Sequence, residues 1–432
     1  MLNYLKKSIN KIIRINIITI LYYDYSMTLT SHIFLYIFAF IIIVYLIITA
    51  YIRVKLNFWL TQPVFHIYNL KFWINPPGLI NKELPKINKY VNLVNNKLIK
   101  VDNESEKDNM IELEQICAFI KNNYMIHKST EYKPSVEDIT SYLKCSNHPS
   151  FFNVYQEPKL LFEKGIPLAV PDKEIIGVIS ARPLNLILIK NNQKISFPVY
   201  YVDNLCIHPT YRKKGIAPEV IQTLYYNIVH ENPKVSVCLF KREGQLNAIV
   251  PLVYYDTYCF DITQLFPEYR LFPSISAIEI GQQHLTLLTG FIREQLKRFK
   301  CSIIPDISNL IHLIKLGKLK IYGLLLNGEF ISIYLFRALE LFYDNKRAIE
   351  CISIISNLHL ASIDILIAGF TIILSKINAD ILLIEETADS KCIVDYLKNN
   401  IGVDMKFKNP TAFFLYNYAC HSIKSSDVLI IY

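Results

Sequence analysis

The chain has 432 residues, a net charge of +9, 52% hydrophobic residues and 19% charged residues. This length allows two domains with substantial cores, and the composition excludes an intrinsically disordered protein. The basic residues are scattered and form no stripe with aromatic residues, which argues against nucleic-acid binding. The nine cysteines show no Cys-x-x-Cys pair and no metal-like spacing with histidine. We therefore expect reduced thiols in a cytosol-facing protein and no metal site.

The first predicted element is a membrane-spanning helix over residues 33–52, a stretch that carries no charge. A run of this length matches the hydrocarbon core of a bilayer, and Arg53 and Lys55 end it. Residues 1–32 would form an N-terminal arm, most of which is not made if Met27 is the true start. The alternative is a buried core helix. Lysine and arginine occur on both sides of the run, so charge does not fix its orientation.

Residues 53–130 are predicted as an extended arm, rich in proline, asparagine and tryptophan, followed by a helix over residues 104–126. The next segment, residues 131–250, is predicted as one domain half. It is expected to contain a helix over 136–143 followed by a loop to 155, strands over 166–170, 175–182, 184–190 and 199–207, a helix over 219–229, and a strand over 235–240.

Residues 251–432 repeat the strand-strand-helix-strand order and are predicted as a second half. The expected helices are 284–299, 303–316, 361–374 and 392–399, and the expected strands are 319–326, 331–339 and 379–385. We therefore predict an α/β (α+β) fold with two pseudo-symmetric halves. Each half would be a mixed, mostly antiparallel sheet flanked by helices.

The strongest functional signal is the basic turn that joins the strand ending near residue 207 to the following helix. It contains Arg212, Lys213, Lys214 and Gly215. Such a turn directs cations and backbone N–H groups to one point before a helix N-terminus, where the helix dipole also favours an anion. The pattern Arg-x-x-Gly-x-Ala is typical of the acyl-CoA pyrophosphate loop of the GNAT acyltransferase superfamily. The alternative interpretation is a solvated cationic turn.

Four blocks of sequence resemble one branch of that superfamily, the N-myristoyltransferases. Residues 203–218 are similar to its Asn-Phe-Leu-Cys-Val-His strand and the Leu-Arg-Ser-Lys-Arg-Leu-Ala-Pro type loop that follows. Residues 58–64 match its Phe-Trp-x-Thr-Gln-Pro-Val block, residues 176–186 resemble its Gly-Phe-Ile-Ser-Ala-x-Pro-x-Asn strands, and residues 415–418 resemble its Leu-Tyr-Asn-Trp. The blocks occur in the family's order and span most of the chain.

The resemblance implies an acyltransferase that moves a long-chain acyl group from acyl-CoA, with myristoyl-CoA as the expected donor, to the N-terminal glycine amine of a protein. It needs no cofactor. Residues 131–250 would bind acyl-CoA and residues 251–432 the acceptor. We expect a monomeric, single-pass membrane protein whose catalytic region faces the cytosol, because CoA thioesters are cytosolic.

The resemblance also assigns site residues. Backbone amides of Asn204 and Leu205 would form the oxyanion hole, and the terminal carboxylate of Tyr432 would be the general base. The expected acyl-CoA contacts are the cations of Arg212, Lys213 and Lys214, the amides of Gly215, Ile216 and Ala217, and the rings of Phe58 and Trp59. An apolar tail that buries a carboxylate would raise its pKa and favour proton uptake.

Each assignment has a structural alternative. Residues 428–432 could be an ordinary edge strand with a solvated terminus, and Phe58 and Trp59 could be core aromatics. His208 is expected to be a packed histidine at a strand end, and Cys206 a buried, inert thiol.

The sequence also departs from the family. Asp203 replaces an asparagine beside the oxyanion strand, where a carboxylate opposes a developing oxyanion unless it points away. The acidic run before Phe-Arg-Phe, the Gly-Asp-Gly loop and the Tyr-Trp-His-Arg segment, the first two implied to hold the substrate peptide, are replaced around residues 146–152, 408–411 and 254–257. Two further hypotheses therefore stay open. One is a catalytically inactive membrane scaffold that binds acyl-CoA or an acylated protein, and the other is a GNAT with another acyl donor and acceptor.

Overall fold

The computed structural model describes residues 32–51, 57–101, 106–124, 130–163, 166–190, 193–244, 248–265, 270–357, 359–400 and 402–432. The chain divides into two compact units, Met1–Gln62 and Pro63–Tyr432.

The first unit contains the helix His32–Tyr51 and the short helix α2 (Asn57–Leu60). The long helix has a mean hydropathy of 2.9, and its large apolar side chains are exposed. A helix of this length and composition could cross a bilayer, and an N-terminal signal sequence would meet the same criteria of length and composition. The predicted segment 33–52 thus coincides with a helix that begins one residue earlier. Ile52 and the predicted arm up to residue 31 lie outside the described residues.

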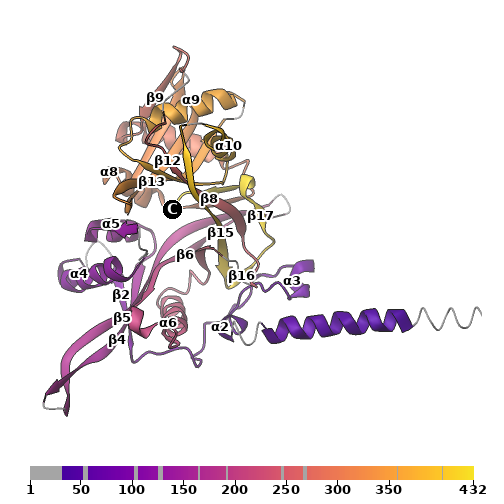
Figure 1. Ribbon diagram of the computed structural model, residues 1–432, viewed down its shortest axis with the longest axis vertical. Helices are drawn as coiled ribbons and strands as arrows, with labels where there is room; N and C mark the ends of the chain where they lie inside the picture. The colour runs from indigo at the N-terminus through magenta and orange to yellow at the C-terminus, as the bar shows by residue number, and fades with distance from the viewer. Residues whose placement is uncertain are drawn as a thin grey trace, which may run out of the picture. The chain divides into compact units, whose positions relative to one another are not determined.

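The second unit begins with an irregular segment and then forms a mixed sheet (Figure 1). Its elements up to residue 243 are α3 (Leu70–Ile74), β1 (Gly78–Leu79), β2 (Asn96–Val101), α4 (Glu106–Asn123), β3 (Thr130–Tyr132), α5 (Val136–Thr140), η1 (Ser141–Leu143), β4 (Ser150–Glu163), β5 (Ile166–Lys190), β6 (Gln193–Ile207), η2 (Pro209–Tyr211), α6 (Ile216–Glu231) and β7 (Cys238–Glu243).

The remaining elements are β8 (Val253–Asp261), β9 (Ile275–Glu279), η3 (Gln282–His284), α7 (Leu285–Gln295), β10 (Cys301–Ile304), α8 (Ile307–Lys315), β11 (Leu319–Leu326), β12 (Glu329–Tyr343), β13 (Lys346–Ser356), α9 (Ile363–Leu374), β14 (Ile381–Glu385), α10 (Lys391–Asn399), β15 (Asp404–Tyr416), β16 (Tyr418–Ala419), β17 (Ile423–Lys424), η4 (Ser425–Asp427) and β18 (Val428–Ile430).

The sheet repeats one pattern twice. In the first part of the unit, β4, β5 and β6 pair antiparallel, and β7 returns parallel to β6 after α6. Later in the chain, β11, β12 and β13 pair antiparallel, and β14 returns parallel to β13 after α9. β8 and β15 join the two parts, so that sixteen of the described strands form one sheet with helices packed against it, while β1 and β16 pair separately. The predicted fold class, a mixed sheet flanked by helices, is confirmed.

Several predicted boundaries are wrong. Residues 166–190 are predicted as three strands, but they form the single strand β5, because pairing with β4 spans the predicted break at residues 171–174 and Pro183 pairs opposite Tyr200 of β6. The second half of the loop predicted over residues 144–155 belongs to strand β4, which pairs with β2 and β5. The helix predicted from residue 303 begins at Ile307, and the residues before it form β10.

Helix α6 is held on the sheet by one apolar face. Its buried residues include Ile216, Val220, Leu224 and Ile228, which recur every four residues and so lie on one side of a helix. This face packs on β4 and β5. The packing fixes the N-terminus of α6 at the end of β6, where the basic turn lies.

The C-terminus lies in the interior of the second unit (Figure 1). β18 pairs in parallel with β10 at one end of the sheet order, so it is an edge strand by pairing. Nevertheless Val428, Leu429 and Ile430 are 0% exposed and Tyr432 is 2% exposed. The alternative of a solvated terminal residue is therefore wrong: the last residue of the chain is buried.

Candidate active site

The basic turn has the conformation of an anion-binding loop. Gly215 is the N-cap of α6 with φ +86°, and Lys213 also adopts a positive φ of 64°. A Cβ built on Gly215 would meet no atom within 4 Å, so glycine is required here for its conformation and not for space. Lys213 and Lys214 are exposed. The loop therefore presents cations and the first amides of α6 to solvent, as binding of a pyrophosphate requires.

Arg212 also anchors the turn. Its Nε donates to the carbonyl of Ile207 at 3.1 Å, and a terminal nitrogen donates to the carbonyl of Asn123 at 3.3 Å. The side chain thus ties the loop to the end of β6 and to α4. Lys214 is placed differently, with its Nζ 4.7 Å from the centre of the Tyr211 ring. The exposed side chains of Lys213 and Lys214 are thus less constrained than that of Arg212, which donates to two backbone carbonyls.

The predicted oxyanion strand contains a β-bulge. Val178 of β5 pairs with Cys206 and Ser180 pairs with Asp203, so Asn204 and Leu205 stand opposite a single residue. Asn204 adopts φ +55°, and its side-chain amide donates to Ser180 Oγ at 2.9 Å. The bulge takes backbone amides out of the regular pairing between β5 and β6. This is the local geometry that an oxyanion hole built from the backbone needs.

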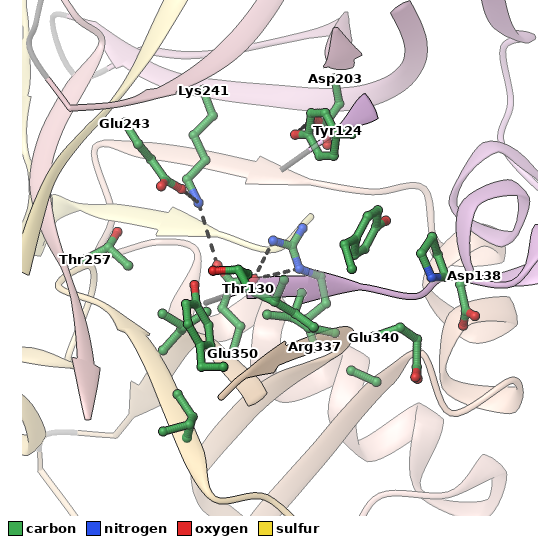
Figure 2. A pocket seen from close by; sticks show the side chains of 18 of the residues that line it. Tyr124, Thr130, Asp138, Asp203, Lys241, Glu243, Thr257, Arg337, Glu340 and Glu350 are labelled. Atoms are coloured by element: carbon green, nitrogen blue, oxygen red, sulfur yellow. Dashed lines mark hydrogen bonds and ion pairs between the residues drawn. The ribbon is translucent and has the colours of Figure 1, made fainter. Parts of the chain in front are cut away.

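A cavity of about 830 Å³ opens beside this bulge (Figure 2). Asn204 and Tyr432 both line it, which brings one predicted oxyanion residue and the predicted terminal base to one site. Its lining also includes Tyr124, Asp138, Tyr142, Ser180, Arg182, Tyr201, Asp203, Lys241, Arg337 and Glu350.

The other predicted site residues lie elsewhere. Leu205 is 38% exposed and does not line the cavity. The turn from Arg212 to Ala217 lies outside the cavity lining as well, at the N-terminus of α6. Phe58 and Trp59 belong to the first unit, where their ring centroids are 5.1 Å apart. Their role as acyl-CoA contacts stays a prediction.

The side chain of Tyr432 enters a buried network of charged groups. Its hydroxyl donates to Glu385 Oε1 and accepts from Lys241 Nζ, each at 2.9 Å. Lys241 Nζ also lies 2.7 Å from Glu385 and 3.6 Å from Glu350. Arg337 pairs with Glu350 from the neighbouring strand through its Nε at 2.7 Å. Figure 2 shows the Lys241 ammonium directed toward the Glu350–Arg337 pair.

Burial and ion pairing shift the pKa values of the two carboxylates of this network in opposite directions. Burial raises the pKa of Glu385, and the negative charge of Glu350 adds to the rise. Burial also opposes ionisation of Glu350, but Arg337 and Lys241 hold its pKa below the usual value. Burial alone would lower the pKa of Lys241, yet Glu385 raises it well above its ordinary value. Lys241 and Glu350 thus stay charged, and Glu385 is the group that holds a proton most readily.

Sequence reasoning missed this network. Its members lie in strands that are mostly apolar, but only Arg337 and Glu350 are isolated there: Lys241 is followed by Arg242 and Glu243, and Glu385 by Glu386. Charged residues are rarely buried without partners. An isolated charge in a strand that is otherwise apolar therefore signals a buried polar site, although it does not identify the partner.

Two residues near the bulge, Cys206 and His208, have the packed positions that the sequence predicts. Cys206 is 5% exposed, and burial raises the pKa of its thiol to about 12, so it stays protonated and unreactive. His208 is half-buried, with its Nδ1 2.8 Å from Thr210 Oγ1 and its ring against Tyr211. Neither residue lines the cavity.

Asp203 makes the contact that bears most directly on catalysis. Its Oδ1 accepts a hydrogen bond from the backbone N–H of Asn204 at 2.8 Å and another from the Tyr124 hydroxyl at 3.2 Å. The negative charge of Asp203, together with burial, raises the pKa of Tyr124 well above its ordinary value. Figure 2 shows the two side chains together at the cavity. The carboxylate thus already accepts a hydrogen bond from one of the backbone N–H groups assigned to the oxyanion hole.

Comparison with solved structures identifies the fold. Two crystal structures of Saccharomyces cerevisiae N-myristoyltransferase with bound myristoyl-CoA align with 88% of this chain at TM-scores of 0.62 and 0.63. They cover 99% and 94% of the yeast chains, with 15% sequence identity. The chain has the N-myristoyltransferase fold. A structure of the yeast enzyme with myristoyl-CoA and inhibitors aligns with 85% of this chain and 91% of its own, at a TM-score of 0.61 and 14% identity.

Sequence comparison gives an independent, narrower match. Residues 133–231 match the acetyltransferase (GNAT) family model, and this segment includes the bulge and the basic turn. No curated protein sequence matches the chain. The N-myristoyltransferase fold and the GNAT match both support an acyl-CoA-dependent acyltransferase, as the motifs predicted. At 15% identity the likeness identifies the fold and leaves the acyl group and the acceptor to be argued from the site.

Proposed function

We propose that the protein transfers a long-chain acyl group, myristoyl in the first instance, from acyl-CoA to the N-terminal glycine amine of a protein. The observation that carries the proposal is the cavity where the Asn204 bulge meets the buried last residue, Tyr432. Acyl transfer to an amine requires a polarised thioester carbonyl, a group that removes a proton from the amine, and alignment of the two. The bulge and the terminal carboxylate would supply the first two within one site.

The acyl-CoA would be bound at the N-terminus of α6. The exposed Lys213 and Lys214 would contact the pyrophosphate as cations, together with Arg212, and the amides of Gly215, Ile216 and Ala217 would donate to its oxygens. The strand β6 leads from this loop back to the bulge. The thioester carbonyl would then lie against the backbone amides of Asn204 and Leu205.

The acceptor amine would enter the cavity and lose its proton to the Tyr432 carboxylate. The attack forms the C–N bond and breaks the C–S bond, and the CoA thiolate takes up a proton. Overall, an acyl thioester and an ammonium group give an amide, a thiol and one proton. The apolar strand β18 buries the end of the chain, and a carboxylate in such a setting accepts a proton more readily.

A membrane position follows from a separate observation. The exposed apolar helix His32–Tyr51 has the length of a bilayer core. In the second unit, α3 exposes Leu70, Trp73 and Ile74, at 70%, 44% and 85%. Tryptophan and apolar side chains of this kind favour the membrane interface. We propose a single-pass protein whose catalytic region is cytosolic and lies close to the bilayer, where long-chain acyl products partition.

One observation favours a second candidate, a non-catalytic protein that binds acyl-CoA. The Asp203 carboxylate occupies the Asn204 amide, and a negative charge there opposes a developing oxyanion. The two functions are separated by incubating the detergent-solubilised full chain with CoA thioesters of several chain lengths and peptides that begin with glycine, alanine or N-acetylglycine. Acylation of only the glycine peptide with a free amine supports the transferase. Tight binding of myristoyl-CoA without transfer to any peptide supports the non-catalytic protein.

A further inference from the structure

The backbone around the predicted oxyanion hole is fixed by several hydrogen bonds. Ser180 Oγ donates to the carbonyl of Asp203 at 3.1 Å and accepts from the Asn204 side chain at 2.9 Å. The bulge and the left-handed conformation of Asn204 belong to this arrangement. The N–H of Asn204 is thus held in place, and the group that occupies it is the side chain of the preceding residue. A side-chain rotation of Asp203 is enough to release the amide.

The Asp203 carboxylate has no cationic partner among the described residues, although it lines the cavity. Arg182 also lines the cavity; burial lowers the pKa of its guanidinium, and Tyr201 and Asp203 act against that lowering. The Arg182 guanidinium is engaged elsewhere, between the rings of Tyr142 and Tyr201 at 5.2 and 5.1 Å. Asp203 is therefore a carboxylate at the reaction site with neutral hydrogen-bond donors only. An ammonium group that enters the cavity would be its first charged partner.

We propose that Asp203 keeps the oxyanion hole closed until the ammonium group of the acceptor binds it. The inference rests on the proposed acyl transfer and adds a condition to it. Without acceptor, the carboxylate occupies the Asn204 N–H and repels negative charge on the thioester oxygen. When the acceptor ammonium pairs with Asp203, the carboxylate turns away, its charge is neutralised, and the amide becomes free to bind the oxyanion.

The consequence is that hydrolysis of acyl-CoA by water stays slow until the acceptor binds. An open oxyanion hole would also accelerate hydrolysis, in which water and the acyl thioester give a fatty-acid carboxylate, CoA thiol and one proton. A hole that opens only with a bound ammonium group restricts the same electrostatic stabilisation to the amine. Asp203 is then an acceptor-binding residue that sets the ratio of transfer to hydrolysis. This role of Asp203 depends on the ammonium group of the acceptor and not on the rest of the acceptor.

Two substitutions separate this role from a structural one. Asp203→Ala removes both the internal acceptor of the Asn204 N–H and the partner of the ammonium group. Asp203→Asn keeps an oxygen that can accept from Asn204 but removes the charge. We expect Asp203→Ala to hydrolyse myristoyl-CoA about 100-fold or more faster than wild type in the absence of any amine, since one oxyanion-hole donor is worth about 10²–10³ in rate. Asp203→Asn keeps the Asn204 N–H occupied but removes the repulsion, so it should hydrolyse myristoyl-CoA faster than wild type and more slowly than Asp203→Ala.

Both variants should raise the KM for a glycine-initiated peptide by about tenfold or more, because each loses a charge-assisted hydrogen bond. Calorimetric binding of myristoyl-CoA to each variant checks that the fold is intact. The inference is overturned if Asp203→Ala hydrolyses no faster than Asp203→Asn, or if neither substitution changes the transfer-to-hydrolysis ratio. Wild-type protein that fails to bind myristoyl-CoA would instead refute the proposed function, and the inference with it.

Discussion

Lys241 provides the sharpest test of the buried charge network. Its Nζ lies 2.7 Å from Glu385, whose side chain is fully buried, and Lys241→Met would leave that carboxylate without a cation. Breaking a buried pair from one side costs about 3–5 kcal/mol. The lower end applies here, because the hydroxyls of Tyr255 and Tyr432 still donate to Glu385. For a unit of about 370 residues, a loss of about 3 kcal/mol lowers Tm by about 4 °C.

Scanning fluorimetry of the detergent-solubilised chain measures this shift, and the chain contains a matched control. Lys297 and Glu294 form a pair at 2.6 Å whose side chains are 70% and 65% exposed. Lys297→Met should change Tm by about 1 °C or less, because exposed pairs are worth about 0–1 kcal/mol. Adding Glu385→Gln to Lys241→Met should recover part of the lost Tm. A Tm for Lys241→Met within about 1 °C of wild type would refute the reasoning.

Three further predictions address the loop, the membrane and acid stability. Gly215→Ala, which places a Cβ at φ +86°, should weaken myristoyl-CoA binding by about tenfold in calorimetry, because the strain of about 1–2 kcal/mol falls on the loop; unchanged affinity would count against a phosphate role. Trp59→Phe leaves Trp73 as the only tryptophan, and its fluorescence in liposomes should be quenched by brominated lipids; emission insensitive to bromine would exclude an interfacial position. Burial acts to raise the pKa of Asp138, but the contact with Lys318 and other hydrogen bonds lower it overall, so this carboxylate stabilises the fold above about pH 4 and stops doing so as the pH falls. Asp138→Asn should therefore lose less Tm than wild type between pH 7 and pH 3, and equal losses would contradict the assignment.

Local chemistry explains what could be predicted from the sequence. The turn before α6 was recognisable because glycine, cations and a following amphipathic helix each have a local meaning. The repeat of antiparallel strands, helix and parallel strand followed from the order of apolar segments. The oxyanion role of Asn204 was expected only through the resemblance, and the bulge at Asn204 could not be derived from the residues, because a register shift depends on which residues of β5 and β6 pair.

Long-range contacts explain what could not be predicted. Lys241, Glu385 and Tyr432 lie on β7, at the end of β14 and at the C-terminus, and only the sheet topology brings them together. Residues 166–190 are predicted as three strands, but pairing with both neighbouring strands makes them the continuous strand β5. The contact between Asp203 and the Asn204 amide is local in sequence, yet its meaning depends on the cavity that both residues line.

The central claim is that acyl transfer occurs where the Asn204 bulge meets the end of the chain. The most direct measurement is the turnover of myristoyl-CoA with a glycine-initiated peptide, followed by mass spectrometry, for wild type and for a chain extended by Gly-Ser-Gly after Tyr432. The same tail placed before Met1 is the control. The account predicts transfer by wild type and by the control, and a loss of about 100-fold or more in the extended chain with myristoyl-CoA binding retained. Equal turnover in the extended chain, or no transfer by wild type, would contradict it.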